Sequence, residues 1–444
     1  MGFIPKPFKK AVVFSNIVLG SLIILFGGGL FFLNFRPVFP FSFIVQSCGL
    51  ITILTLFFAF GLKEERKTSI ALSTFSLIGC LFCIEVVMEF GPQKYINIGL
   101  AKKEGRIFDT RKRFEVVRDL KNQGFDAWPQ LNPKIFLKQR GLGPKNKKIF
   151  PLSGISGKKT VYCNENGEYT IYDSDEYGFN NNRGLYKTGA VDIILVGDSF
   201  ANGACVQPGE DVTGQLRHNG LRALNFGMGG NGPLLELAAI SEFVRPLKPS
   251  IVLWLYYEEN DLLELLEEKK SPLLTSYLQD DFNQNLYQKQ DTVDRLLREY
   301  VDQMKSKEKT VKIKYSWGRV VRLVNIRTRL GLALPKPIPP FMLFHDILEQ
   351  AIKRVDAWGG ELYFVYLPGF TRHQQTRSED EDLFYRSKVL SIVNELRIPV
   401  IDFEEVLASR NDPLSLFPLR VHGHYNAAGY SLLADLIIKG LKEK

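Results

Sequence analysis

Three long apolar runs open the chain. Residues 11–33, 41–62 and 70–88 contain a single charged residue, Glu85. Each run is close to the ~20 residues that a helix needs to cross a bilayer. A cleaved signal peptide would account only for the first run, and two more follow closely. The pattern therefore predicts three transmembrane helices within residues 1–92.

The loops around these runs differ in their Lys and Arg content, which predicts an orientation. Basic residues precede the first run and separate the second from the third: Lys6, Lys9, Lys10, Lys63, Arg66 and Lys67. The loop between the first two runs holds only Arg36. Because short cytoplasmic loops are enriched in basic residues, the N-terminus is expected in the cytoplasm. The basic residues that follow the third run argue for the opposite orientation: Lys94, Lys102, Lys103 and Arg106. On balance we expect a bacterial inner (cytoplasmic) membrane protein whose remaining residues lie on the periplasmic or extracellular side.

The pattern changes in the second half of the chain. Short, wholly apolar runs rich in β-branched residues are expected strands at 191–196, 223–226, 251–256, 362–367 and 398–401. Stretches of helical periodicity lie between them at 212–219, 234–244, 344–357 and 384–396. Apolar strands that alternate with helices are typical of a parallel sheet covered on both faces. Residues 151–444 are therefore predicted to form a three-layer α/β domain.

Two segments interrupt this scheme. Residues 93–150 contain one amphipathic helix at about 108–124 and then a stretch rich in Pro, Gly and Lys, which indicates a basic helical connector. A charged insertion at about 262–334 has helical periodicity. Because ligands of such folds bind beyond the strand ends, the insertion is expected to form a lid or subdomain there.

The net charge of +9 does not indicate nucleic-acid binding. Beyond residue 90 the chain carries 50 basic and 44 acidic residues, and the excess is local, with 14 basic and five acidic residues in 102–148. This is a weak footprint for a nucleic-acid partner. A basic stretch beside a membrane span favours anionic head groups or an acidic glycan, and a merely solvated surface is the alternative.

The five cysteines predict no metal site. Cys48, Cys80 and Cys83 lie within the apolar runs, whereas Cys163 and Cys205 fall in the outer domain. The latter two could pair in an oxidising compartment. No cysteine or histidine spacing matches a metal site, and no cofactor is expected.

Candidate chemistry gathers where the predicted strands end. Gly197-Asp198-Ser199-Phe200 directly follows the first strand, so Ser199 would project from the carboxyl edge of the sheet. Taken alone, Asp and Ser there could simply cap a helix. Three further polar or Gly-rich blocks follow strands or loops at the same expected edge: Asn225–Asn231, Asn260-Asp261 and His424-Tyr425-Asn426.

In this order the blocks resemble the SGNH (GDSL-type) ester hydrolase family, with its GDS serine, Gly, Asn and late His. The resemblance covers about residues 190–442 apart from the insertion. Residues 175–180, Asp-Glu-Tyr-Gly-Phe-Asn, also resemble the segment before the serine block in membrane-anchored bacterial members. The resemblance implies a flavodoxin-like parallel sheet.

The resemblance also implies roles for individual residues. Ser199 would be the nucleophile and His424 its base. The amides of Ser199 and Gly230 and the side chain of Asn260 would form the oxyanion hole, with Gly227 or Gly229 as alternatives to Gly230.

Two positions depart from the family pattern. Glu258 stands where the family has a Gly, two residues before the Asn. Val421 stands where the family has its acid, three residues before the His. His424 would then be oriented by a backbone carbonyl or by a carboxylate from elsewhere, such as Asp412 or Asp402. The alternative base is His422.

These observations predict a membrane-anchored serine ester hydrolase that acts outside the cytoplasm, on O-acyl groups of a glycan. Two alternatives stay open. An O-acyltransferase would use the same Ser-His site, and a non-catalytic glycan-binding or assembly protein would carry a decayed one. The expected partners are the lipid bilayer and an acylated glycan, with no nucleic acid.

Overall fold

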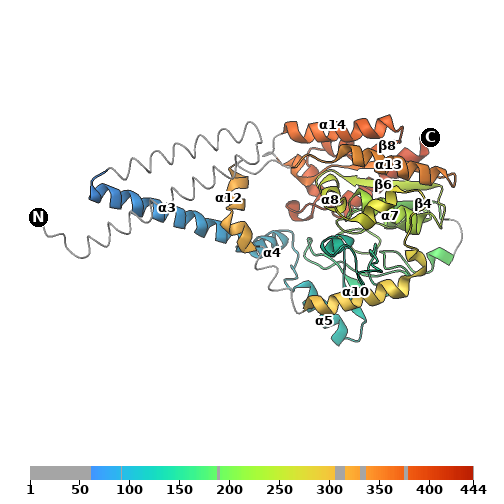
Figure 1. Cartoon of the computed structure of the whole chain (residues 1–444), viewed down its shortest axis with the longest axis horizontal. Coiled ribbons are helices and arrows are strands. Elements are labelled where there is room, and N and C mark those ends of the chain that lie inside the picture. The colour runs from blue at the N-terminus through green and yellow to red at the C-terminus, as the bar shows by residue number, and fades with distance from the viewer. Residues whose placement is uncertain are drawn as a thin grey trace, which may run out of the picture. The chain divides into compact units, whose positions relative to one another are not determined.

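The computed structural model describes residues 62–91, 93–187, 191–305, 316–330, 337–374 and 379–443 (Figure 1). By their contacts these residues form two compact units. The first unit combines residues 62–91 with 316–330, and the second combines 93–305 with 337–443. The first two apolar runs, 11–33 and 41–62, fall outside the described residues apart from Leu62.

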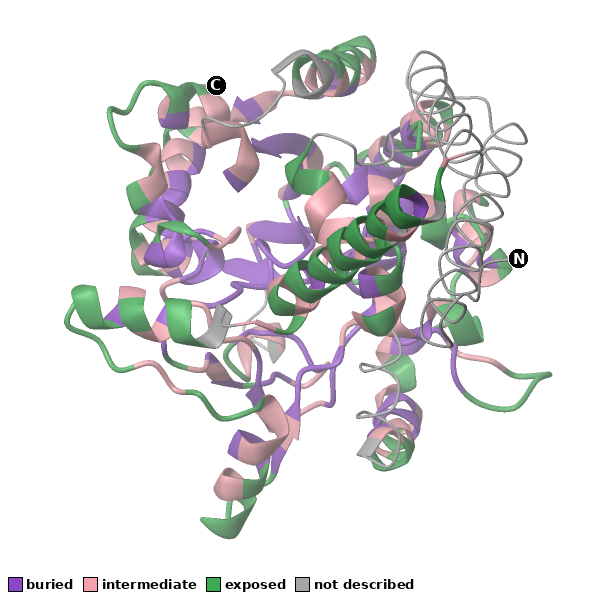
Figure 2. Cartoon of the chain, turned by 90° about the vertical axis from the view of Figure 1, so that its left-hand side faces the viewer, coloured by how far each residue is buried: buried purple, intermediate pink, exposed green. Residues whose placement is uncertain are grey.

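Helix α3 (Glu64–Phe90) dominates the first unit. Its residues Glu65–Phe90 have a mean hydropathy of 2.2 in their most apolar window, which makes α3 the one described helix long and apolar enough to cross a membrane. Most of its side chains are exposed (Figure 2). The exposed apolar side chains along α3 are suited to contact with lipid. Of the three predicted spans, only this one can be compared with the structure.

Part of the insertion packs on α3 within the same unit. Glu85 is buried and accepts hydrogen bonds from the backbone amides of Asn325 (2.7 Å) and Ile326 (2.9 Å), at the start of α12 (Val324–Arg329). Glu89 accepts from Arg319 at 2.9 Å. The first amides of a helix lack intrahelical acceptors, so a carboxylate is a favourable partner. Residues 316–330 of the insertion expected at about 262–334 thus belong to the unit of α3, whereas residues 262–305 belong to the second unit.

The second unit is built on a five-stranded parallel sheet with the order β5-β4-β6-β7-β8. Its strands are β4 (Ile193–Gly197), β5 (Ala223–Asn225), β6 (Ile251–Tyr257), β7 (Glu361–Leu367) and β8 (Val400–Asp402). In chain order this is the 2-1-3-4-5 arrangement of flavodoxin-like folds. The predicted α/β fold with a parallel sheet is confirmed.

Helices cover both faces of this sheet. Alternate strand residues point to opposite faces, so Ile194 and Val196 lie in one hydrophobic core and Ile193 and Leu195 in the other. The first core is closed by α7 (Pro233–Ala239), its π-helical extension η3 (Ile240–Val244), α8 (Asp261–Glu268), α13 (Phe341–Asp356) and α14 (Glu379–Glu395). The second is closed by α6 (Val212–His218), α15 (Phe403–Ala408) and α16 (Ala427–Lys442). The strands themselves are almost wholly buried (Figure 2).

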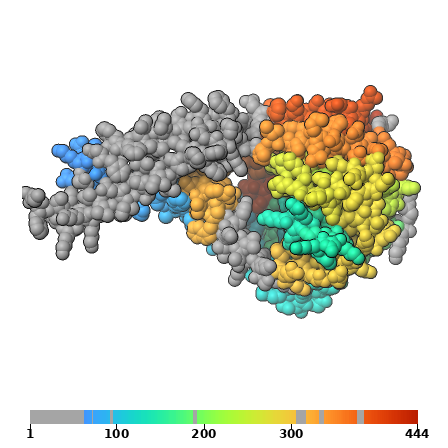
Figure 3. All heavy atoms as spheres, in the orientation of Figure 1, coloured from blue at the N-terminus to red at the C-terminus, as the bar shows by residue number. Residues whose placement is uncertain are grey.

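Residues 93–187 fold onto the same unit. They form α4 (Gln93–Lys103), α5 (Arg113–Asn122), η1 (Pro133–Gln139), η2 (Leu185–Lys187) and a small sheet of β1 (Ala127–Pro129), β2 (Lys159–Val161) and β3 (Ile171–Asp173). Phe136 is fully buried and contacts Tyr300 of α10 (Gln290–Lys305), with ring centroids 5.1 Å apart. Residues near 140 and α10 lie side by side on the surface (Figure 3). The segment 93–150, treated above as a connector, thus shares the main core.

Short helices complete the second unit. They are α9 (Pro272–Thr275), η4 (Ser276–Leu278), η5 (Leu286–Gln288), η6 (Phe370–His373), η7 (Pro413–Leu416) and η8 (Pro418–Arg420).

Candidate active site

Ser199 lies just beyond the carboxyl end of β4, the strand at which the order of the sheet reverses. β5 pairs with one side of β4 and β6 with the other, so their connections leave in opposite directions. Flavodoxin-like sheets form their binding crevice at this point. Ser199 is 9% exposed, which makes it buried but still accessible.

His424 lies beside Ser199. Its Nε2 is 2.9 Å from Ser199 Oγ. The helix that follows, α16, begins at Ala427 and is capped by Asn426, whose side chain accepts from the Gly429 amide. This cap fixes the end of the loop that presents His424. The structure thus brings together the two side chains that the sequence motifs single out.

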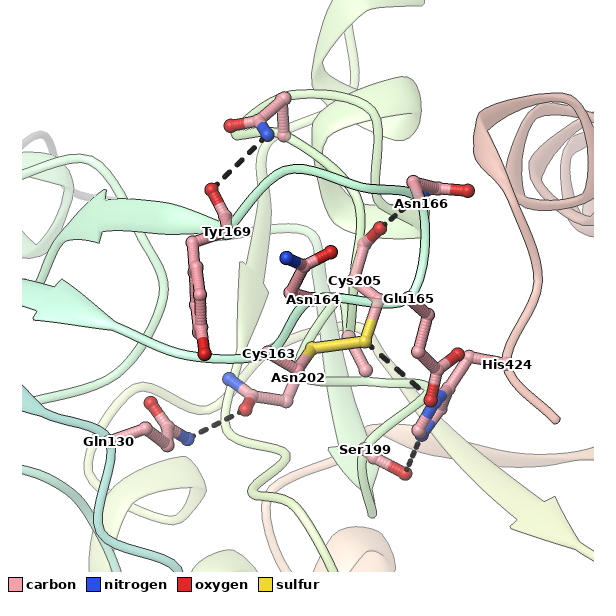
Figure 4. The surroundings of a disulfide bond; sticks show 12 residues. Gln130, Cys163, Asn164, Glu165, Asn166, Tyr169, Ser199, Asn202, Cys205 and His424 are labelled. Atoms are coloured by element: carbon pink, nitrogen blue, oxygen red, sulfur yellow. Dashed lines mark hydrogen bonds and ion pairs between the residues drawn. A yellow bond between two sulfur atoms is a disulfide. The ribbon is translucent and has the colours of Figure 1, made fainter. Parts of the chain in front are cut away.

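A carboxylate completes the constellation (Figure 4). Glu165 Oε1 is 2.8 Å from His424 Nδ1, on the side of the imidazole opposite to Ser199. The side chains of His424 and Glu165 are 25% and 20% exposed. Carboxylate, imidazole and hydroxyl therefore form one continuous chain of hydrogen bonds, as in a catalytic triad.

Glu165 comes from a hairpin tip that precedes the serine in the chain. The tip joins β2 to β3 and is closed by hydrogen bonds between Tyr162 and Thr170 (2.9 Å) and between Thr170 and Cys163 (2.8 Å). A disulfide joins Cys163 to Cys205, in the loop that follows Ser199 (Figure 4). The hairpin tip thus lies against the serine loop.

Neither aspartate considered from the sequence is this acid. Asp412 pairs with Arg420 at 2.6 Å, and Asp402 pairs with Arg386 and caps α15. The family pattern places its acid just before the late His, whereas Glu165 precedes the serine in the chain, so the pattern does not indicate Glu165. One signal was present: a Cys163–Cys205 pair would place Glu165 next to the serine loop.

The electrostatics of the site couple the two titrating groups. Burial lowers the pKa of His424, but the adjacent Glu165 carboxylate and, to a smaller extent, Asp198 together outweigh this effect, so the pKa is raised above the usual value. Burial raises the pKa of Glu165, and its contact with His424 outweighs that effect and lowers the pKa. Each partner therefore stabilises the charged form of the other.

His422 does not occupy the position of a base. The hydrogen bond to Ser199 comes from His424, and His422 Nε2 is buried with no partner among the described residues. Burial lowers the pKa of His422. The structure thus agrees with the choice of His424 over His422.

Hydrogen-bond donors lie around Ser199. Asn260 Nδ2 donates to Asp198 Oδ2 at 3.0 Å, and Ser199 Oγ lies 3.1 Å from the same oxygen. Within the described part of the chain, the amides of Ser199 and Gly230 donate to no acceptor. Buried amides rarely lack a partner, so free ones at a crevice suit an incoming oxyanion.

The glycine loop after β5 contains three amides that were considered as the second donor of the oxyanion hole. The Gly227 amide already donates to Asn225 Oδ1 at 2.7 Å, so Gly227 is not a free donor. The Gly229 amide, like that of Gly230, meets no acceptor in the described residues. Gly229 and Gly230 therefore remain as candidates.

Residues of the small-sheet region cover this loop. A Cβ at Gly230 would lie 2.5 Å from Lys134 Nζ, and one at Gly229 would lie 2.6 Å from the Tyr162 hydroxyl. Lys134 pairs with Glu264 of α8 at 3.0 Å. The positive φ of Gly230 (+71°) and the close approach of Tyr162 to Gly229 explain why the loop carries glycines.

The departure at Glu258 has a structural explanation. Its carboxylate accepts from Arg372 Nε at 2.9 Å and from the Gly369 amide at 2.6 Å. Glu258 therefore ties the end of β6 to the loop after β7, at the edge where Asn260 follows.

One group of potential metal ligands lies at the site. Atoms of Glu165, Cys205 and His424 come within 4.8 Å of one another. Cys205 is bonded to Cys163, so it offers no thiolate to a metal ion. The arrangement suits nucleophilic acyl chemistry, in which the imidazole takes the serine proton.

Comparisons with known proteins give only distant structural likenesses. No family model and no curated protein matches the sequence. Solved structures similar to this chain include a lipolytic protein of the G-D-S-L family from Desulfitobacterium hafniense (12% identity, 56% of this chain and 99% of that one, TM-score 0.34). A lipase/acylhydrolase from Enterococcus faecalis (14% identity, 57% and 96%, TM-score 0.33) and the acetyl xylan esterase AlAXEase (12% identity, 56% and 100%, TM-score 0.31) are also similar.

Proposed function

We propose that this chain is a membrane-anchored serine ester hydrolase of the SGNH type. Ser199 is the nucleophile, His424 is its base, and Glu165 orients and stabilises the imidazole. The observation that carries the proposal is the unbroken series of contacts from Glu165 through His424 to Ser199, at 2.8 and 2.9 Å.

The geometry supports a two-step acyl transfer. Nε2 of His424 takes the Ser199 proton as the serine oxygen attacks the ester carbonyl, and returns it to the departing alcohol. A water then attacks the acyl-serine, with the same imidazole as its base, and releases the acid. Glu165 stabilises the imidazolium that forms in each step.

Negative charge develops on the carbonyl oxygen in both steps. The free amides of Ser199 and Gly230 and the second hydrogen of Asn260 Nδ2 would donate to that oxygen. Loss of one such donor typically costs about 3 kcal/mol of transition-state stabilisation.

We further propose that the enzyme acts outside the cytoplasm, on O-acyl groups of a glycan. Helix α3 supports the anchor, and the distribution of basic residues around the apolar runs supports the side. The 14 basic residues of 102–148 would favour an acidic polymer as the substrate.

One observation favours the alternative of O-acyl transfer to a sugar. Ser199 is only 9% exposed, so little of it is open to solvent. A covered acyl-serine is protected from water, which leaves time for a second alcohol to attack. The complete triad argues against a decayed, non-catalytic site.

Turnover of a simple aryl ester tests the proposal. The purified full chain should hydrolyse 4-nitrophenyl acetate, and Ser199→Ala and His424→Ala should each abolish that activity. Adding an O-deacetylated polysaccharide as acceptor separates the two enzymes, because a transferase would acetylate it at the expense of free acetate. Equal hydrolysis by wild type and Ser199→Ala would overturn the proposal.

A further inference from the structure

The acid of the triad, Glu165, lies outside the family-like part of the chain, and contacts with that part hold it in place. Glu165 is two residues beyond Cys163, and Cys205 is six residues beyond Ser199. The disulfide between these cysteines is the one covalent link among the described residues between the hairpin tip and the serine loop. It bridges the two segments within a few residues of the reacting groups (Figure 4).

Besides the disulfide, the hairpin tip is held by the packing of Cys163 against buried Tyr172 and Ala204 and by hydrogen bonds at its border. Asn166 Nδ2 donates to the Cys205 carbonyl at 2.8 Å, and Asn164 Nδ2 donates to the Asp109 carbonyl at 2.9 Å. Glu165 Oε2 is buried but has no partner among the described residues. Among the described residues, His424 is therefore the hydrogen-bond partner that holds the Glu165 carboxylate. The position of the Glu165 backbone depends on the contacts of the hairpin tip.

Packing does not support the tip on every side. An open cavity of about 770 Å³ is lined by Asn166 and Glu168 of the tip, by Cys205 and Gln207 of the serine loop, and by Arg106. Space beside the tip leaves it room to shift if the covalent link is removed. A catalytic hydrogen bond is sensitive to displacements of this kind, since a shift of ~1 Å can cost about 100-fold in rate.

We propose that the Cys163–Cys205 disulfide is a positioning element of the active site, which holds Glu165 on His424, so that full activity requires the oxidised form. The inference rests on the proposed function. A disulfide with this role makes turnover depend on the redox state of the compartment, because thiols stay reduced in the cytoplasm and pair outside it. The chain would reach full activity only after its second unit has crossed the membrane.

Reduction by dithiothreitol tests this directly. The sulfur–sulfur bond breaks and accepts two electrons and two protons to give two thiols, while the reagent closes to its cyclic disulfide. Reduction of the full chain should lower kcat for 4-nitrophenyl acetate by about tenfold or more, with little change in KM, because an acid that orients the base affects mainly turnover. The acid limb of the pH–rate profile should also move to lower pH, because His424 loses the carboxylate that raises its pKa.

The effect of reduction must act through Glu165. In Glu165→Gln the orienting carboxylate is already lost, so reduction should change kcat less than twofold. The double variant Cys163→Ser/Cys205→Ser should have the kcat of the reduced wild type and no response to reductant. A Cys80→Ser/Cys83→Ser variant, which removes the two free cysteines of α3, should respond as the wild type does.

Three results would contradict the inference. One is unchanged wild-type turnover after reduction is verified by thiol counting. Another is an equal proportional loss in wild type and Glu165→Gln, which would mean that the disulfide only stabilises the fold. The third is the absence of Ser199-dependent hydrolysis in either redox state, which alone would contradict the proposed function as well.

Discussion

Glu165 gives the triad its sharpest test at the level of a single residue. Glu165→Gln keeps the shape of the side chain but removes the charge that stabilises the imidazolium. Loss of the orienting acid lowers kcat by about 10⁴-fold in a well-studied serine protease, so a fall of ~10²- to 10⁴-fold is expected. Steady-state hydrolysis of 4-nitrophenyl acetate measures it.

The same variant should change the pH dependence in a defined direction. The base must be neutral, so activity is lost as the pH falls through the pKa of His424, which burial lowers and Glu165 raises to a net value above normal. Without the Glu165 carboxylate, burial still lowers the pKa of His424 and only the smaller effect of Asp198 raises it, so the acid limb should move to lower pH. A limb that stays in place or moves to higher pH would show that Glu165 does not act on His424.

Gly230 tests the oxyanion donors. Its φ of +71° is unfavourable for alanine, and an added Cβ would lie 2.5 Å from Lys134 Nζ. Gly230→Ala should therefore lower stability by ~1 kcal/mol and shift the amide. We expect kcat to fall about tenfold with KM nearly unchanged, as for a donor that acts in the transition state.

Gly220 provides the matched control for this change. It has a φ of +81°, and an added Cβ would meet nothing within 4 Å. Gly220→Ala should lower the free energy of unfolding by about as much as Gly230→Ala does, measured by urea denaturation, and should leave kcat unchanged. Equal kcat values in the two variants would exclude Gly230 from the site.

The residues of the site differ in how far the sequence reveals them. Ser199, Asn260 and His424 each follow a strand or precede a helix at the expected edge of the sheet. The alternation of strands and helices in the sequence is therefore enough to predict that these residues lie together. Glu165 sits on a hairpin tip, and its position depends on a disulfide and on packing between segments distant in the chain. No local pattern encodes such a position.

At the scale of elements, the ion pair of Glu258 and Arg372 joins β6 to the loop after β7. The two side chains are 11% and 12% exposed. Removing one partner of a buried pair typically costs about 3–5 kcal/mol, because it leaves an uncompensated charge. Arg372→Met should therefore lower the free energy of unfolding by ~3 kcal/mol, measured by urea denaturation in detergent.

Two controls accompany this prediction. Arg222→Met breaks the exposed pair with Asp192, whose side chains are 55% and 37% exposed, and should cost less than ~1 kcal/mol. Burial raises the pKa of Glu258 and Arg372 lowers it to a net value below normal, so the ion pair stabilises the fold above the unfolded-state pKa. The deficit of Arg372→Met should thus shrink as the pH falls below about 4, where Glu258 can protonate. A deficit that persists unchanged in acid would contradict this account.

The elements themselves show where periodicity succeeds as a predictor. All five expected strands match β4 to β8 within a few residues. Short apolar runs between helices are readily predicted as strands, because a buried strand of a parallel sheet is the element that such a run most often forms. In the insertion, helical periodicity indicates helices but does not state which surface each helix contacts. Buried Glu85 selects the start of α12, and that choice depends on tertiary contact.

The whole molecule raises the question of sidedness. We predict that a periplasm-dependent alkaline phosphatase fused after Lys94 is active, whereas the same reporter fused near Lys67 is inactive. The basic residues that flank the apolar runs are the physical reason, since positive loops remain in the cytoplasm. Immunoblots of both fusions control for expression. The reverse pattern of activity would contradict the proposed action on an exported glycan.

The most direct test of the central claim is the site at which a fluorophosphonate reacts with the intact, oxidised chain. Only a serine activated by a base is phosphonylated at an appreciable rate. We predict a single adduct on Ser199 by mass spectrometry, formed more slowly in Glu165→Gln and absent in His424→Ala. An unmodified Ser199, or labelling that persists at the same rate without His424, would contradict the account.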